Sequence, residues 1–324
     1  MIKEPTDPRS ACAYAHYGGV MDATRKDRFE AAPEISLVMS VFDDSAAPLA
    51  PPAVPVLFLH GLSQQRAFWG PVVRRLHSRP VAALDQRGHG ESDTPLGSDF
   101  SVAACADDVV AALDHLGWPT AVVVGHSWGG SVALSAAARH PSRISAAVLI
   151  DGGLWSPSGL GPRDEIRARL TPPALGLAAE DLWARIRQGE LGNGWSAERQ
   201  GALAPTFVAD GAGNLSTRIG VGRHLAVLDG LLDHDVDADL AMCESNRVPI
   251  WAAVCDPAQP AAAPEGLDGS WQDVKQAAVE RAERIDGCLV HRWRGGIHDV
   301  PLQWPALVAG FVDTVVESRE GGGA

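Results

Sequence analysis

The sequence predicts an α/β protein in which a mostly parallel central sheet is flanked by helices and interrupted by a helical insertion. Short apolar runs alternate with helical patterns along most of the chain, as is typical of strands joined by crossover helices. Runs such as 121–124 are apolar at every position, as expected for strands that are covered on both faces. The alternation stops between residues 154 and 243, so we expect a separate segment there.

The expected elements alternate in chain order. Strands are expected at residues 34–42, 54–59, 81–84, 121–124, 146–150, 248–255 and 288–293. Helices are expected at residues 102–116, 131–140, 271–285 and 306–317. The prolines within residues 48–52 predict a loop after the first strand, because proline cannot donate to a sheet ladder.

The length of 324 residues suits one large domain with an insertion. Residues 1–33 are polar and show no clear period, so we expect an N-terminal extension. The core is then expected to comprise residues 34–153 and 244–324. Residues 154–243 are expected to form a helical cap without strands, because helical pieces there are separated by a proline pair and by glycine-rich turns.

The composition is that of a soluble globular protein, with 46% apolar and 21% charged residues. Forty acidic residues against 27 basic ones give a net charge of -13, which disfavours a nucleic-acid partner. The chain has no uninterrupted apolar run of about 18 residues, so no membrane contact is expected. The polar N-terminus lacks the pattern of a signal peptide, so we expect the protein in the cytoplasm.

The cysteines give no sign of a metal or redox site. They are scattered and form no CxxC pair, so we expect reduced structural thiols. The five positions are Cys12, Cys105, Cys243, Cys255 and Cys288. The sequence suggests neither a metal nor an organic cofactor, and it carries no signal for the oligomeric state.

The strongest chemical signal is the segment Gly125-His126-Ser127-Trp128-Gly129-Gly130, which lies between an expected strand and an expected helix. Small residues on both sides of Ser127 allow a tight turn that exposes the serine hydroxyl at the edge of the sheet. The following helix N-terminus favours negative charge that develops nearby. We therefore interpret Ser127 as a nucleophile.

With this segment, the chain resembles the α/β-hydrolase-fold enzymes. The resemblance also rests on His60-Gly61, on the segment DQRGHGES at residues 85–92 and on Ile297-His298-Asp299, all in the expected order. Residues 149–153 and 298–303 further resemble a group of bacterial, lid-bearing hydrolases of largely unassigned substrate. The resemblance implies that the main-chain amides of Leu62 and Trp128 form the oxyanion hole.

A serine nucleophile needs a general base, because its hydroxyl is barely ionised at neutral pH. Among the eleven histidines, His298 follows the last expected strand and comes last in chain order, as the Ser, acid, His order of this fold requires. The motif histidines His60, His89 and His126 are expected to serve as hydrogen-bonding scaffold. We therefore expect His298 to be the base.

Two aspartates are candidates for the acid that orients the histidine. In most of the fold the acid follows the strand after the cap, but Asp256 comes about two residues early after the proline that begins this strand. Asp151 lies at the tip of the strand after the nucleophile, where some members of the fold carry the acid. We favour Asp151 over Asp256.

A serine nucleophile limits the reactions that the protein can be expected to catalyse. A serine argues against the haloalkane dehalogenases and epoxide hydrolases of this fold, which use an aspartate in its place. We expect a hydrolase that acts on a small, apolar carboxylic ester or lactone. Thioesterase, carbon–carbon hydrolase and cofactor-free perhydrolase chemistry stay open, as does a non-catalytic ligand-binding protein of the same fold. Aromatic cap residues could line the pocket or form a helical core, namely Trp155, Trp183, Trp195 and Phe207.

Overall fold

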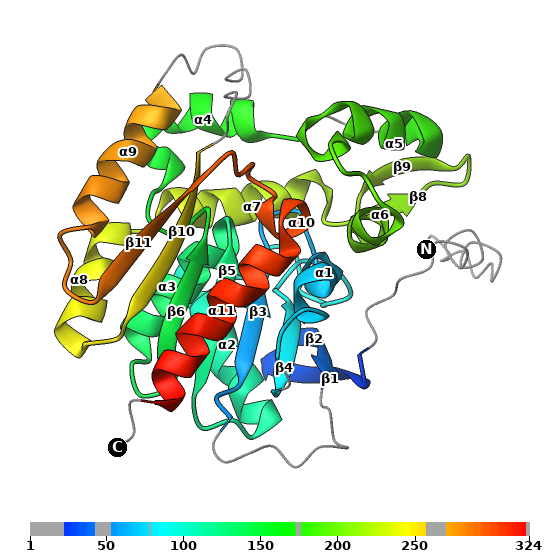
Figure 1. Cartoon of the computed structure of the whole chain (residues 1–324). Coiled ribbons are helices and arrows are strands. Elements are labelled where there is room, and N and C mark those ends of the chain that lie inside the picture. The colour runs from blue at the N-terminus through cyan, green and yellow to red at the C-terminus, as the bar shows by residue number, and fades with distance from the viewer. Residues whose placement is uncertain (1–22, 43–52, 78, 173–175, 257–269, 322–324) are drawn as a thin grey trace.

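The computed structural model describes residues 23–42, 53–77, 79–172, 176–256 and 270–321 (Figure 1). Its centre is an eight-stranded sheet with the strand order β1-β2-β4-β3-β5-β6-β10-β11. The strands are β1 (Arg25–Ala32), β2 (Ile35–Phe42), β3 (Val56–Leu59), β4 (Val81–Asp85), β5 (Ala121–His126), β6 (Ile144–Ile150), β10 (Ile250–Asp256) and β11 (Cys288–Arg294). All neighbours from β4 to β11 pair in parallel, whereas β1 and β2 are antiparallel. The expected fold class is confirmed.

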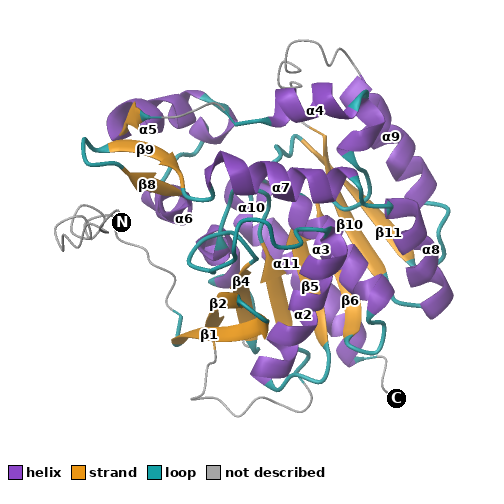
Figure 2. Cartoon of the chain, turned by 180° about the vertical axis from the view of Figure 1, so that it is seen from behind, coloured by secondary structure: helices purple, strands orange, loops and turns teal. Residues whose placement is uncertain are grey.

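Helices cover both faces of the central sheet, and Figures 1 and 2 show the two faces in turn. One face is covered by α1 (Gly70–Val73), α10 (Val300–Gln303) and α11 (Pro305–Glu320). The other is covered by α2 (Val102–Leu116), α3 (Trp128–Arg139), α8 (Val236–Asn246) and α9 (Ser270–Ala282). This arrangement explains why the inner strands are apolar at nearly every position.

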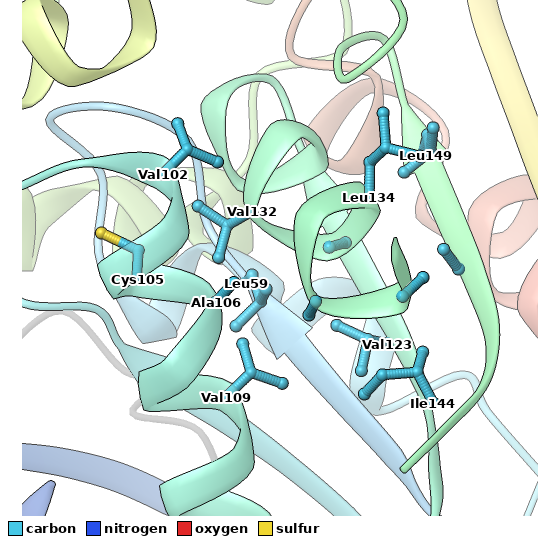
Figure 3. Close-up of a cluster of buried hydrophobic side chains, with 14 of the residues drawn as sticks. Leu59, Val102, Cys105, Ala106, Val109, Val123, Val132, Leu134, Ile144 and Leu149 are labelled. Carbon is cyan, nitrogen blue, oxygen red and sulfur yellow. The ribbon is translucent and has the colours of Figure 1, made fainter. Parts of the chain in front are cut away.

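The sheet separates two hydrophobic cores, because successive side chains of a strand point to opposite faces. In β5, Val122 and Val124 join the core under α11, whereas Val123 joins the core under α2 and α3. Figure 3 shows this second core, to which Val102, Cys105, Ala106 and Val109 of α2 contribute buried side chains. Their spacing of three and four residues places them on one side of α2.

The N-terminal boundary of the core differs from the expectation. Residues 25–32, which were expected to belong to the extension, form β1 and pair with β2. The strand was not predicted because it lies at the sheet edge, where Phe29 is its only buried residue and most of the others are charged. Residues 1–22 and the loop expected at 48–52 lie outside the described residues.

The insertion also differs from the expected helical cap, because it contains strands as well as helices. It contains α4 (Arg163–Leu170), α5 (Ala179–Gln188), α6 (Ala197–Leu203) and α7 (Gly220–Leu232). A small antiparallel sheet joins β7 (Leu177–Ala178), β9 (Asn214–Thr217) and β8 (Phe207–Ala209) in that order. These strands have two to four residues, too few to show an alternating pattern, so the expectation of no strands was wrong.

The end of the insertion lies earlier than residue 243. Helix α8 begins at Val236 and packs on α3 of the core, where the buried Cys243 thiol lies 3.8 Å from the carbonyl oxygen of Leu134. Beside the central sheet, α5, α6, β8 and β9 gather into one group, whereas α4 and α7 lie across one end of the sheet (Figures 1 and 2). The predicted cap boundary at 243 therefore cuts through a helix of the core.

The four cysteines in the described part of the chain are buried and unpaired. Burial raises the pKa of each thiol, to about 12 for Cys243 and Cys288. Within the same residues, no helix combines the length and the apolar character that crossing a membrane requires.

Candidate active site

Ser127 lies in the sharp turn between β5 and α3. Its φ of 53° is unusual for a residue with a side chain, so the surrounding backbone must hold the turn. The neighbours leave no room for side chains: a Cβ on Gly125 would lie 2.0 Å from the carbonyl oxygen of Gly129, and a Cβ on Gly152 would lie 2.2 Å from that of Ser127. The small residues around Ser127 are therefore a steric requirement of the turn.

The structure brings together three of the residues singled out in the sequence. His298, in the loop after β11, has its Nε2 3.0 Å from the Ser127 hydroxyl. Its Nδ1 lies 2.8 Å from a carboxylate oxygen of Asp151, which directly follows β6. The alternative acid, Asp256, ends β10 with an exposed side chain, and its carbonyl oxygen accepts a hydrogen bond from the amide of Gly295. Asp151, and not Asp256, contacts His298.

The Asp151 carboxylate is only 3% exposed and has two further donors on its other oxygen. The backbone amide of Cys255 donates to Oδ1 at 2.9 Å, and the ammonium of Lys275 donates to the same atom at 2.6 Å. Burial by itself would raise the pKa of Asp151, but His298 and then Lys275 outweigh it and lower the pKa to about 2. Asp151 is therefore ionised at neutral pH.

Lys275 was not identified from the sequence. It lies on α9, more than a hundred residues from Asp151, and no local motif surrounds it. A lone lysine on an amphipathic helix ordinarily indicates a solvated face. Its role at Asp151 follows only from the tertiary structure.

His298 lies at the open side of this group, with its side chain 53% exposed. Desolvation lowers the pKa of His298, but the hydrogen bond to Asp151 and the charges of Asp151 and Asp299 outweigh it, so the pKa lies above its ordinary value. The backbone is fixed as well, because Nε2 of His126 donates to the carbonyl oxygen of His298 at 2.8 Å. The imidazole is thus held at both its ring and its main chain.

The motif histidines contact the backbone of the site. His60 lies 2.8 Å from the carbonyl oxygen of Gly61 and accepts from the amide of Gln86. His89 accepts from the amide of Ser63 at 3.3 Å. Burial lowers the pKa of His60 to about 3, so it is neutral at pH 7. These bonds shape the loop after β3.

Leu62 lies in this loop, and Trp128 is the first residue of α3. The amide of a first helical residue has no partner within its helix, so the Trp128 N–H is free of the helical ladder. Gln64 holds the loop beside Leu62, because its side-chain oxygen accepts from the amide of Gly61 at 2.9 Å. Both Leu62 and Trp128 border the same pocket as Ser127. Their role in an oxyanion hole stays a prediction.

A pocket of about 260 Å³ opens at Ser127. Its walls come from both the core and the insertion, they are mainly apolar, and none of the lining residues is a lysine or an arginine. They are Leu62, Ser127, Trp128, Ser131, Asp151, Gly152, Gly153, Trp155, Pro157, Leu170, His224, Leu228, Leu231, Trp271 and His298. An apolar pocket with a few polar groups at one end is typical of a small-molecule site.

The aromatic residues expected around the pocket divide into two groups. Trp155 lines it, and Trp271 of α9, which was not predicted, lines it as well. Trp183, Trp195 and Phe207 instead pack on one another within the insertion, with ring centroids 5.7 and 6.1 Å apart. These three therefore belong to the core of the insertion, although only Trp183 lies on a helix and Phe207 belongs to β8. Among the described residues, no group of three or more His, Cys, Asp or Glu side chains is arranged to hold a metal ion.

The sheet order, the turn at Ser127 and the helical layers define an α/β-hydrolase-fold protein. Comparison with known families agrees, because the family described as alpha/beta hydrolase fold matches residues 54–196. The match covers the first part of the core and the start of the insertion, and the chain has the fold of this family.

Solved structures show the same fold at low sequence identity. The crystal structure of E-2-(acetamidomethylene)succinate hydrolase has a TM-score of 0.69 at 20% identity, covering 90% of this chain and 99% of that one. The thioesterase domain from the curacin biosynthetic pathway has a TM-score of 0.66 at 19% identity, with the same coverage.

Sequence relatives match a shorter region. A putative carbamate hydrolase, RutD, from Caulobacter vibrioides is 41% identical over 102 residues, which is 31% of this chain and 37% of that protein. The lipase LipV from Mycobacterium tuberculosis is 36% identical over 118 residues, which is 36% of this chain and 44% of that protein. The chain thus aligns with less than half the length of these relatives.

Proposed function

We propose that this protein is a serine hydrolase that cleaves a small carboxylic ester or lactone with an apolar acyl group. The observation that carries the proposal is the continuous chain of hydrogen bonds from Ser127 through His298 to Asp151 at the base of the pocket. Its distances of 3.0 and 2.8 Å lie within the range required for proton transfer to a general base.

The reaction would proceed in two stages. His298 Nε2 takes the hydroxyl proton as Ser127 Oγ attacks the ester carbonyl, and the tetrahedral intermediate expels the alkoxide, which leaves as an alcohol with that proton. Water then loses a proton to His298 and attacks the acyl-enzyme, releasing the acid and restoring the serine. Asp151 holds the histidine tautomer and stabilises the imidazolium, while the amides of Leu62 and Trp128 bind the oxyanion.

The walls of the pocket support an uncharged, apolar acyl group. Trp155, Trp271, Leu228 and Leu231 contribute apolar surface, and burial of such surface favours binding by about 25 cal/mol per Å². A substrate carboxylate would find neither a lysine nor an arginine among the lining residues. The relatives named as a carbamate hydrolase, a lipase and a thioesterase support hydrolysis of a carbonyl substrate in general.

The test is labelling with a fluorophosphonate probe, which reacts with activated serines. We expect the native protein to be labelled at Ser127 and to hydrolyse p-nitrophenyl esters, and the Ser127→Ala variant to lose both properties. Ser131→Ala is the matched control, since Ser131 also lines the pocket but makes no contact with His298 among the described hydrogen bonds. Labelling that persists in Ser127→Ala would contradict the proposal.

A substrate panel separates the remaining chemistries. Neutral esters and lactones, thioesters, carbamates, a carbon–carbon hydrolase substrate and a peracid-forming assay should be compared by kcat/KM on the native protein. We expect esters or lactones with apolar acyl groups to have the highest values. Higher values for another class would reassign the substrate, and tight binding without turnover of any would favour the ligand-binding alternative.

A further inference from the structure

Lys275 occupies an unusual place beside the acid of the proposed triad. Its ammonium lies 2.6 Å from Asp151 Oδ1 and 2.7 Å from the carbonyl oxygen of Cys255. It also lies over the ring of Trp155, 5.0 Å from the centroid. Only 17% of the lysine side chain is exposed. Two oxygens and an aromatic face therefore surround a cation that is largely withdrawn from water.

The two ends of the Asp151 carboxylate have different partners. Oδ2 faces His298, whereas Oδ1 receives the amide of Cys255 and the ammonium of Lys275. Three donors on one carboxylate fix its rotation, so the oxygen that faces the imidazole cannot turn away without breaking a buried ion pair. Lys275 therefore contributes to the alignment of His298 through Asp151.

The charge of Lys275 has a second effect. When His298 accepts the serine proton it becomes a cation, which Asp151 attracts and Lys275 repels. The pair Asp151–Lys275 is neutral overall, so the imidazolium is stabilised less than it would be by an isolated carboxylate.

We propose that Lys275 is a positioning residue of the active site. It fixes the Asp151 carboxylate, and it keeps His298 unprotonated, and so able to act as a base, at lower pH. This inference rests on the proposed serine-hydrolase function. It requires that the ammonium act on the imidazole through the carboxylate and through space, without contacting the substrate.

The other charged and titratable groups near His298 must be considered in a pH experiment. Asp151 follows β6, and Asp299 is the next residue in the loop. His126, at the end of β5, has its ring centroid 4.9 Å from that of His298. Burial lowers the pKa of His126 to about 3, so it stays neutral above pH 5. Lys275 is thus the one cation among these neighbours.

The experiment compares the native protein with Lys275→Met, which keeps the aliphatic stem but removes the charge. Lys275→Gln removes the charge and keeps a hydrogen-bond donor, and Lys275→Arg keeps the charge. The matched control is Lys26→Met, because Lys26 is an exposed lysine on β1 that pairs with Glu91. All five proteins are used as full chains, and circular dichroism checks that they are folded.

Two measurements are made on each protein. The pKa of His298 is obtained by NMR titration of isotopically labelled histidine, with the signal assigned by its loss in His298→Asn. The acid limb of kcat/KM is measured on a p-nitrophenyl ester. We expect Lys275→Met and Lys275→Gln to raise the pKa of His298 and the midpoint of the acid limb by about one pH unit each, because a like charge at close range is removed. In Lys275→Arg and Lys26→Met, the His298 pKa and the midpoint of the acid limb should stay within a few tenths of a pH unit of the native values.

An unchanged His298 titration in folded Lys275→Met and Lys275→Gln would overturn the proposal. A loss of kcat with no shift of the acid limb would also overturn it, since that result indicates a purely structural lysine. Failure of the proposed function is a separate outcome. A native protein that turns over no substrate still gives the NMR titration, which decides the effect of Lys275 on His298.

Discussion

Replacing Asp151 by asparagine tests the proposed site at its most constrained group. The carboxylate accepts hydrogen bonds on both oxygens, from Cys255 and Lys275 on one side and from His298 on the other. An asparagine can offer only one acceptor end. If its oxygen stays with Lys275, its NH₂ group faces His298, which must then leave Nδ1 unprotonated. Nε2 would carry the proton and could not accept one from Ser127.

The opposite orientation of the asparagine is less favourable, because its NH₂ group would face the amide of Cys255 and the ammonium of Lys275. That arrangement sets donors against donors and removes one of the two oxygens that accept from the Lys275 ammonium. We therefore expect the unproductive tautomer to dominate, with a loss of kcat of about 10⁴-fold by analogy with the serine-protease triad.

Stability should change as well. The pKa of Asp151 is lowered from 3.8 to about 2 in the folded protein, which corresponds to about 2 kcal/mol of stability. Because the folded pKa is the lower one, this contribution is present above pH 3.8 and is lost as the pH falls towards 2. At pH 7, Asp151→Asn should therefore unfold at a lower urea concentration than the native protein.

The assay is p-nitrophenyl ester hydrolysis by folded Asp151→Asn, with urea unfolding measured on the same samples. Asp256→Asn is the matched control, since the Asp256 side chain is exposed and we expect less than a threefold change in kcat. A loss of less than tenfold in Asp151→Asn, or an equal loss in Asp256→Asn, would refute the reasoning.

Three further predictions follow from other groups. The pKa of His298 is raised above 6.5, so kcat/KM should fall as the pH drops through a value above 6.5; a pH profile with its acid limb below 6 would contradict this. Gly152→Ala should lower the free energy of unfolding in urea by about 1–3 kcal/mol, because the new Cβ would lie 2.2 Å from the carbonyl oxygen of Ser127. The control Gly310→Ala, in an open part of α11, should be neutral or stabilising. Arg87→Ala should cost about 3–5 kcal/mol in the same assay, because it leaves Asp108 buried without its partner; equal stability would show that the ion pair is dispensable.

The sequence predicted the parts of the fold that have a local signal. The inner strands and the helices that cover them show strong apolar patterns over many residues, and the turn at Ser127 has a motif set by steric limits. The order of the motifs along the chain predicts His298 as the base, and a position at a strand tip predicts Asp151 as the acid. Apart from the chain order, each of these signals depends on only a few neighbouring residues.

The features that were missed depend on contacts between distant residues. Strand β1 is charged because an edge strand has one exposed side, and the strands of the small sheet are too short to show a period. Nothing in the sequence distinguishes Trp271 from the rest of its helix, although it lines the pocket. Lys275 has no sequence neighbour that marks its contact with Asp151. The roles of such residues become evident only from their contacts in the folded structure.

The pairing of β5 with β6 determines which part of the proposed triad can move. His126 and Ile150 are the last partners in the parallel ladder, and Ser127 and Asp151 directly follow them. The amide of Ser127 donates to the carbonyl oxygen of Ile150 at 3.0 Å, which fixes this end of the two strands. Their separation is set by the backbone of the sheet and can change only if that ladder breaks. His298 lies on a loop and is half exposed, and it is held by individual hydrogen bonds to Asp151 and His126 and not by a sheet ladder. Ser127 and Asp151 thus form the rigid part of the proposed site, and we expect any slow motion that switches proton transfer on or off to be a motion of the loop that carries His298.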